Sequence, residues 1–157
     1  MDKKNLLESK IGPKLSTVGK KSKILALQRF AMHHYPITPE QFSILAALME
    51  NDGMYQSQIA ASTMKDRPNI TRLTNILENM NFVKRKADVN KRKVFKIFIT
   101  EEGKRTYNLI LPTILEIWKD TIDNINDDEL EITLNVLQKI RINLDNNINI
   151  KNNVVRG

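Results

Sequence analysis

The chain has 157 residues, of which 41% are hydrophobic, and a formal net charge of +7. A chain of this length buries about 68–70% of its unfolded surface, which is enough for one domain or two small lobes with a true core. It contains no cysteine, and this excludes disulfides, thiolate metal ligands and thiol-based redox sensing.

The first predicted element is a long helix. Apolar residues recur with helical spacing from Ile11 to His34, whereas Met1 to Lys10 has mixed charge and no apolar segment. Tyr35-Pro36 should end this helix, because a residue before proline is pushed out of the helical region. No run of the sequence approaches the roughly 20 apolar residues that span a bilayer, so we expect a soluble, cytoplasmic protein.

The two histidines of the chain, His33 and His34, lie at the end of this helix. Neighbouring side chains on a helix point about 100° apart, and no nearby helical His or Cys completes a metal cage. The five glycines never lie close enough together for a phosphate-binding loop, a dinucleotide site or a nucleophile elbow. We therefore expect no metal, no cofactor and no enzyme; the alternative is an enzyme that uses the His pair as a general base.

A second helix should begin after Thr38. Thr38 can cap it, Pro39 suits its first position, and Gln41 completes a capping box. Asn51-Asp52-Gly53 should end this helix, and a short helix from about Gln56 to Ser62 is expected to follow. A tyrosine precedes the short helix where Ser or Thr would cap it more strongly.

The next helix has a clear start, because Asp66 can cap it and Pro68 lies in its first turn. Its buried side is predicted from apolar residues at helical spacing, namely Ile70, Leu73, Leu77 and Met80. The opposite side is polar and carries no acid between Asn69 and Leu77. Its residues are Asn69, Thr71, Arg72, Asn75 and Asn79.

After this helix the apolar period changes from helical to two, which predicts a β-hairpin of Phe82–Ala87 and Phe95–Ile99 around a loop at Asp88–Lys93. Between Thr63 and Lys96 the chain has ten Lys or Arg against three Asp or Glu, so this segment carries the whole net charge. Two close helices followed by a basic hairpin indicate a winged helix-turn-helix whose cationic surface suits duplex nucleic acid. The alternative is a plain α+β fragment with a solvated charged loop.

Two further helices are expected. One begins after Thr100 with Glu101 and Glu102 in its first turn, and Pro112 should kink or interrupt it. The last runs from about Asp127 to Asn147 and has apolar residues on two faces, which suggests burial against another subunit. The alternative is a helix sandwiched within its own monomer. Residues 101–131 contain nine acids against three bases, so this part should not lie on DNA.

The predicted fold class is therefore mostly α with a small β-hairpin wing, in which a winged helix-turn-helix joins a helical dimerisation lobe. We assign residues 37–100 to the DNA-binding lobe, and residues 1–36 and 101–157 to the dimerisation lobe.

The order of these elements and several short motifs resemble the MarR family of dimeric winged-helix transcriptional regulators, over about residues 10 to 147. The motifs that carry the resemblance are Gln56-Ser57-Gln58-Ile59-Ala60, Lys65-Asp66-Arg67-Pro68-Asn69-Ile70-Thr71-Arg72-Leu73, Leu77-Glu78, Val83-Lys84-Arg85, Asp88 with Arg92, and Ile99-Thr100 with Gly103. The chain departs from the family pattern at Tyr55, where Thr is usual, at Met64, where small residues are common, and at Lys91, where Asp is frequent.

The resemblance implies that the helix from Arg67 to Met80 enters the major groove and that the hairpin reaches the backbone or the minor groove. The predicted DNA-binding residues are Lys65, Arg67, Pro68, Asn69, Thr71, Arg72 and Asn75, with Lys91, Arg92 and Lys93 in the wing. Asp88 should hold the wing by pairing with Arg92. The chemistry of these side chains allows Arg72 to form bidentate hydrogen bonds with guanine, and Asn69 or Asn75 to form them with adenine. Further phosphate contacts are expected from Lys84, Arg85, Lys86 and Lys96.

The function expected from these features is that of a homodimeric regulator, most simply a repressor, which binds an inverted-repeat site in double-stranded DNA. The resemblance further implies release by a small aromatic effector in a pocket between the lobes. Phe30, Met32, Tyr35 and Trp118 are candidates for its lining, with ordinary core packing as the alternative. A different class of function, a winged-helix module that binds an acidic protein, is opposed by the acid-free helix face.

Overall fold

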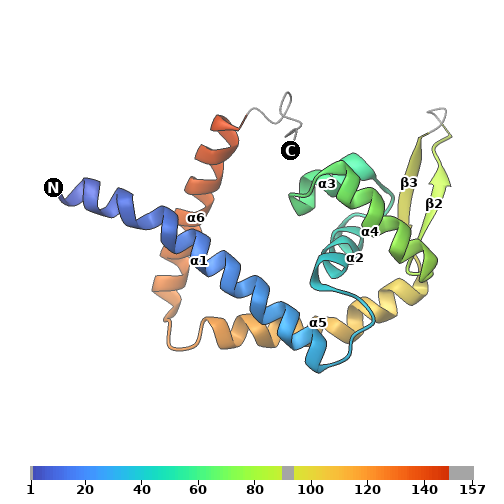
Figure 1. Cartoon of the computed structure of the whole chain (residues 1–157), viewed down its shortest axis with the longest axis horizontal. Helices are drawn as coiled ribbons and strands as arrows, with labels where there is room; N and C mark the ends of the chain where they lie inside the picture. The colour runs from blue at the N-terminus through green and yellow to red at the C-terminus, as the bar shows by residue number, and fades with distance from the viewer. Residues whose placement is uncertain (1, 90–93, 149–157) are drawn as a thin grey trace. The chain divides into compact units, whose positions relative to one another are not determined.

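The computed structural model describes residues 2–89 and 94–148 (Figure 1). Helices and strands follow one another along the chain in the order α1 (Lys3–Met32), α2 (Pro39–Glu50), β1 (Met54–Tyr55), α3 (Gln56–Thr63), α4 (Arg67–Asn79), β2 (Val83–Ala87), β3 (Phe95–Ile99), α5 (Glu101–Thr121) and α6 (Asp127–Asn147). The chain divides after Trp118 into two compact units. The prediction of a mostly helical fold with a small β-hairpin is confirmed.

The hairpin belongs to a three-stranded antiparallel sheet of order β1-β3-β2. Val83 pairs with Ile99 and Ala87 with Phe95, so the two long strands are in register over their whole length. The third strand, β1, was not predicted, because two residues carry no readable period. Asp52 fastens it, since its carboxylate accepts hydrogen bonds from the backbone N–H of Gly53 at 3.0 Å and of Ile99 at 2.9 Å.

Helix starts agree closely with the capping residues in the sequence. The Gln41 N–H donates to the Thr38 hydroxyl at 3.3 Å and the Thr38 N–H donates to the Gln41 side chain at 2.8 Å, which is the predicted capping box. Asp66 accepts from the Asn69 N–H at 2.8 Å. The last helix begins at the predicted Asp127.

Helix ends agree less well. The first helix starts at Lys3, before the predicted Ile11, and ends at Met32, before Tyr35-Pro36. His34 adopts a left-handed φ of 53°, and the Tyr35 N–H donates to the Phe30 carbonyl at 3.2 Å. This Schellman turn, reinforced by the edge-on contact of the Phe30 and Tyr35 rings, ends the helix ahead of the proline.

Pro112 does not interrupt the fifth helix, which continues from Glu101 to Thr121. The proline ring removes one backbone hydrogen bond, whose acceptor would be the Asn108 carbonyl. Both residues are solvent-exposed, so water can hydrate the freed carbonyl. Of the predicted kink or interruption, the interruption does not occur, because the cost of the proline falls at the helix surface, while the kink stays a prediction.

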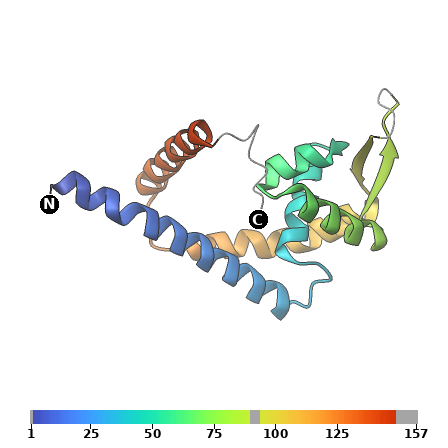
Figure 2. The same cartoon turned by 45° about the horizontal axis from the view of Figure 1, so that its top comes forward.

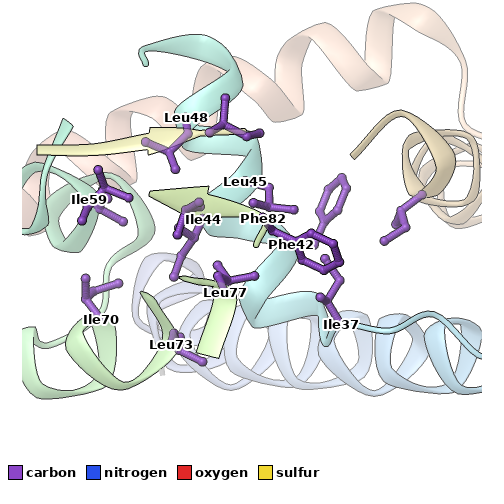
Figure 3. Close-up of a cluster of buried hydrophobic side chains, with 14 of the residues drawn as sticks. Ile37, Phe42, Ile44, Leu45, Leu48, Ile59, Ile70, Leu73, Leu77 and Phe82 are labelled. Carbon is purple, nitrogen blue, oxygen red and sulfur yellow. The ribbon is translucent and has the colours of Figure 1, made fainter. Parts of the chain in front are cut away.

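The core of the first unit is formed by apolar side chains from the end of α1 through the middle of α5 (Figure 3). Ile44, Leu45 and Leu48 of α2 are fully buried and face Ile59 of α3 and the inner side of α4. Phe30 of α1 and Ile110 of α5 belong to the same cluster. The winged helix is thus anchored on both flanking helices, whereas no residue of α6 is buried.

A close backbone approach joins the start of α5 to the turn between α4 and β2. Gly103 lies against Phe82, so a Cβ there would stand 2.1 Å from the Phe82 carbonyl oxygen. Replacing Gly103 with Ala should therefore lower the free energy of unfolding by about 2 kcal/mol or more, as overpacking and backbone displacement do. Urea denaturation followed by circular dichroism measures the change.

The matched control is Gly12→Ala in α1, where an added Cβ meets nothing within 4 Å. That substitution should be neutral or stabilising by about 0.5–1 kcal/mol. Equal unfolding midpoints for the two variants would contradict the close approach at Gly103.

Candidate nucleic-acid interface

Helix α4 presents two sharply different sides. Its inner side packs Ile70, Leu73, Thr74 and Leu77 into the core. Most of the sequence-predicted DNA contacts lie on the other side, where Arg67, Pro68, Thr71, Arg72 and Asn75 are exposed and Asn69 is partly exposed. The helix therefore offers a continuous polar strip to a partner.

Two side chains of this strip are already bonded to each other. The Arg72 guanidinium donates to the Asn69 amide oxygen at 2.9 Å, one turn apart on the helix. This bond holds the arginine along the outer side of α4 while its other N–H donors stay available. The arrangement is compatible with the guanine contact predicted for Arg72.

Arg85 of strand β2 connects the hairpin to α4. Its guanidinium donates to the Glu78 carboxylate at 2.6 Å and also to the Asn75 amide oxygen. A weaker contact of 3.4 Å reaches the Thr74 hydroxyl, and the Arg85 backbone N–H donates to Glu78 at 3.2 Å. One side chain thus fixes the position of the hairpin relative to the polar strip.

Arg85 was expected to contact phosphate, whereas in the structure its guanidinium donates to Glu78. The strand period could have shown this difference. Arg85 lies two residues from the buried Val83 and so shares its inward face, while Lys84 and Lys86 are exposed on alternate positions. Of the predicted strand cations, Lys84 and Lys86 are the ones turned to solvent.

Gln56, which was not among the predicted DNA-binding residues, joins the first turn of α3 to α4. Its side-chain oxygen accepts from the Thr71 hydroxyl and its nitrogen donates to the Thr74 hydroxyl, both at 3.2 Å. The Thr71 hydroxyl also lies 3.0 Å from the Arg67 carbonyl. Thr71 therefore contributes to positioning α4 as well as to its outer surface.

Lys65, in the turn before α4, lies beside a carboxylate. Its ammonium is 4.0 Å from Glu40 of α2, which is also 2.9 Å from Lys23 of α1. The Lys23 hydrogen bond lowers the pKa of Glu40, and the charges of Lys65 and Arg72 lower it further, although desolvation raises it. Lys65 is mostly buried and so has less reach toward a ligand than Lys84 or Lys86.

A groove of about 430 Å³ lies between the start of α3, the start of α4 and the hairpin. Gln56 and Ser57 line it from α3, and the cations Arg67 and Arg85 from α4 and β2. Its remaining residues are Tyr55, Val94, Phe95 and Ile97. Figure 2 shows the hairpin standing beside α4 within this unit. The polar strip and the hairpin thus border one concave, cationic surface.

The base of the wing is held by Tyr55, whose hydroxyl donates to the Asp88 carboxylate. Lys96 lies over the Tyr55 ring at 5.2 Å from its centroid. The predicted partner of Asp88, Arg92, is outside the described residues, as are the predicted contacts Lys91 and Lys93. The family-typical Thr is replaced here by a side chain long enough to reach the wing.

The four candidates for an effector pocket have different environments. Phe30 is 4% exposed and Tyr35 packs beside it, with its hydroxyl 2.6 Å from the Thr113 hydroxyl. Met32 is 69% and Trp118 50% exposed. None of them lines a second groove of about 520 Å³, which lies between α1, α2 and α4 around Glu40 and Arg72. Their role in ligand binding stays a prediction.

Among residues 2–89 and 94–148, no three His, Cys, Asp or Glu gather to hold a metal ion. His33 stacks on Tyr35 with ring centroids 5.2 Å apart. None of the helices in this same part of the chain has the length and apolar content to cross a membrane.

Comparison with known proteins gives a consistent result. The model of the MarR family matches residues 37–95, which span α2 to the start of β3. A curated relative, the uncharacterized HTH-type transcriptional regulator YybA of Bacillus subtilis (strain 168), is 27% identical over 109 residues, covering 69% of this chain and 73% of YybA.

Solved structures show the same fold. The crystal structure of the transcriptional regulator SlyA aligns with a TM-score of 0.79 at 22% identity, covering 88% of this chain and 96% of SlyA. MepR of S. aureus in complex with DNA aligns with a TM-score of 0.76 at 21% identity, covering 85% of this chain and 97% of MepR.

The Tyr55–Asp88 contact predicts a measurable shift in tyrosine titration. The hydrogen bond to Asp88, followed by desolvation and the charge of Asp88, raises the pKa of the Tyr55 phenol above 10.0. A raised pKa means that the bond is fully formed below about pH 10 and is lost as the pH rises through the folded value. Asp88→Ala should therefore lower the alkaline midpoint of one tyrosine, measured by absorbance.

Tyr55→Phe identifies which part of the absorbance change belongs to this residue. If the alkaline titration curve of Tyr55 in Asp88→Ala equals its curve in the parent protein, the Tyr55–Asp88 bond does not exist in solution.

Proposed function

We propose that this chain, which the model of the MarR family matches at residues 37–95, is a sequence-specific regulator of transcription that binds double-stranded DNA. The observation that carries this proposal is the outer side of α4, which combines Arg72 with two amide side chains and has no carboxylate from Asn69 to Leu77. Side chains of this kind make hydrogen bonds to base edges in the major groove.

The surroundings of α4 supply the cations that a phosphate backbone requires. Lys84 and Lys86 are exposed on β2, and Arg67 borders the groove beside α3. Phosphate contacts fix the register of a protein on DNA, while base contacts specify sequence. MepR, which has the same fold, is solved as a DNA complex, and this supports a DNA ligand for the corresponding surface here.

We further propose that the protein acts as a homodimer. Helix α6 has no buried residue although it carries Leu134, Leu137 and Leu144, each between 42% and 67% exposed. Helix α1 leaves Val18 and Ile24 more than half exposed. Covering such side chains gains about 25 cal/mol per Å² of apolar surface, so a second copy is the expected partner. Two-fold symmetry then calls for an inverted-repeat DNA site.

The proposal also includes regulation by a small aromatic ligand and repression in the absence of that ligand. It further includes a cytoplasmic location. A ligand can shift DNA binding only if it prefers one spacing of the two α4 helices to the other. The structural relative BpsR of Bordetella bronchiseptica, whose DNA binding is regulated by 6-hydroxynicotinic acid, supports this part (TM-score 0.70, 16% identity, 82% of this chain and 98% of BpsR).

Residues that contact bases and residues that contact phosphate should differ in their effect on DNA binding. Arg72→Ala should flatten sequence preference, costing about 1–3 kcal/mol on the preferred site and much less on unrelated DNA. Lys86→Ala should weaken all duplexes similarly and reduce the salt slope by about one unit. Fluorescence anisotropy with genomic fragments at several salt concentrations measures both. The reverse pattern would assign base contact to Lys86 and phosphate contact to Arg72. Absence of DNA binding would contradict the proposed function.

The dimer predicts the form of the protected site. Footprinting on a retained genomic fragment should show two protected half-sites of opposite orientation, centred about one helical turn apart. Sedimentation of the free protein should give twice the mass of one chain. Protection of a single unrepeated half-site would contradict the dimeric arrangement.

A further inference from the structure

We propose that α4 reads base edges that accept hydrogen bonds, chiefly guanine or thymine, because Arg85 orients Asn75 so that only its amide NH₂ faces the DNA. Arg85 is thus a positioning residue for sequence specificity. This inference rests on the proposed DNA-binding function and specifies the chemistry that the helix selects.

The orientation of the Asn75 amide follows from the chemistry of its partner. A guanidinium has N–H donors and no acceptor, so a hydrogen bond from Arg85 can end only on the amide oxygen of Asn75. The oxygen is therefore turned toward β2, and the NH₂ group occupies the other arm of the planar amide. Asn75 itself is exposed, which leaves that NH₂ free to meet a ligand.

Arg85 is in turn fixed from a second direction. Glu78 accepts from its guanidinium at 2.6 Å and from its backbone N–H at 3.2 Å. Both groups of this ion pair are about two-thirds or more removed from solvent, with side-chain exposures of 27% and 34%. The guanidinium cannot turn away from Asn75 without giving up a charge-assisted bond.

The same polarity recurs about 1.7 turns earlier on the helix. Arg72 donates to the Asn69 amide oxygen at 2.9 Å, so the NH₂ of Asn69 is again the uncommitted end of the amide. Three side chains of the polar strip, Asn69, Arg72 and Asn75, therefore present donors, and the carboxylate of this region, Glu78, is occupied by Arg85.

A surface of hydrogen-bond donors distinguishes among the base edges in the major groove. Guanine offers the N7 and O6 acceptors and thymine the O4 acceptor, whereas adenine places its N6 donor beside N7 and cytosine offers only the N4 donor. An asparagine pairs bidentately with adenine by using its oxygen and its NH₂ together. At Asn75 the oxygen is turned toward Arg85. The proposed contact therefore runs from the NH₂ group to an acceptor on the base, in place of the bidentate adenine contact suggested by residue type.

The experiment is selection of binding sites from a random duplex library by the full-length protein and by three variants. Asn75→Ala identifies the base position that Asn75 reads, because preference there is lost. At that position the parent protein should enrich guanine or thymine about five-fold or more over adenine. Arg85→Lys keeps the positive charge beside Glu78 but removes the fork, and it should shift the preference toward adenine. Thermal melts verify that it folds.

Arg105→Lys is the matched control, since Arg105 pairs with Glu102 on α5 and should leave the selected sequence unchanged. Enrichment of adenine at the Asn75-dependent position by the parent protein would overturn the inference, as would an Asn75→Ala profile identical to the parent. Neither result would contradict the proposed function, because each can be obtained only if the protein selects DNA sequences from the library. Failure to select any sequence would instead overturn the proposed function.

Discussion

The geometry of the candidate interface depends on one ion pair between a helix and a strand. Arg85 and Glu78 are both partly exposed, so solvent screening leaves their attraction with little net effect on stability. Their effect is geometric, because the guanidinium also reaches Asn75 and the Glu78 carboxylate also accepts from the β2 backbone. The hairpin, α4 and the direction of one amide are thereby set together, and the proposed specificity follows from that arrangement.

Rigid packing beneath this surface makes the arrangement durable. The inner side of α4 lies in a core to which α1, α2, α3, the sheet and α5 all contribute, and Gly103 lets the start of α5 approach the turn between α4 and β2 at backbone distance. Hydrogen bonds from Gln56 connect α3 to α4 at the edge of that core. The proposed reading side chains thus project from an element that has little freedom to shift.

Charge and apolar surface are distributed in opposite parts of the sequence. The segment from Thr63 to Lys96 carries the whole net charge, while residues 101–131 are acidic. The apolar side chains that remain exposed are concentrated in α1, α5 and α6. In the proposed dimer these helices bury one another, and the basic segment binds the phosphate backbone.

The sequence by itself determined the starts of the helices after α1, the hairpin and the polar side of α4, because caps and apolar periods act over a few neighbouring residues. It also identified the MarR resemblance that the match to residues 37–95 confirms. Only the tertiary structure decided the Schellman end of α1, the two-residue strand β1 and the partners of Arg85, Gln56 and Tyr55. Each of these depends on groups brought together from distant segments or on backbone φ, and local periodicity carries no information about them. Residue type allowed Asn75 to read adenine, but the position of Arg85 settles which end of its amide is free.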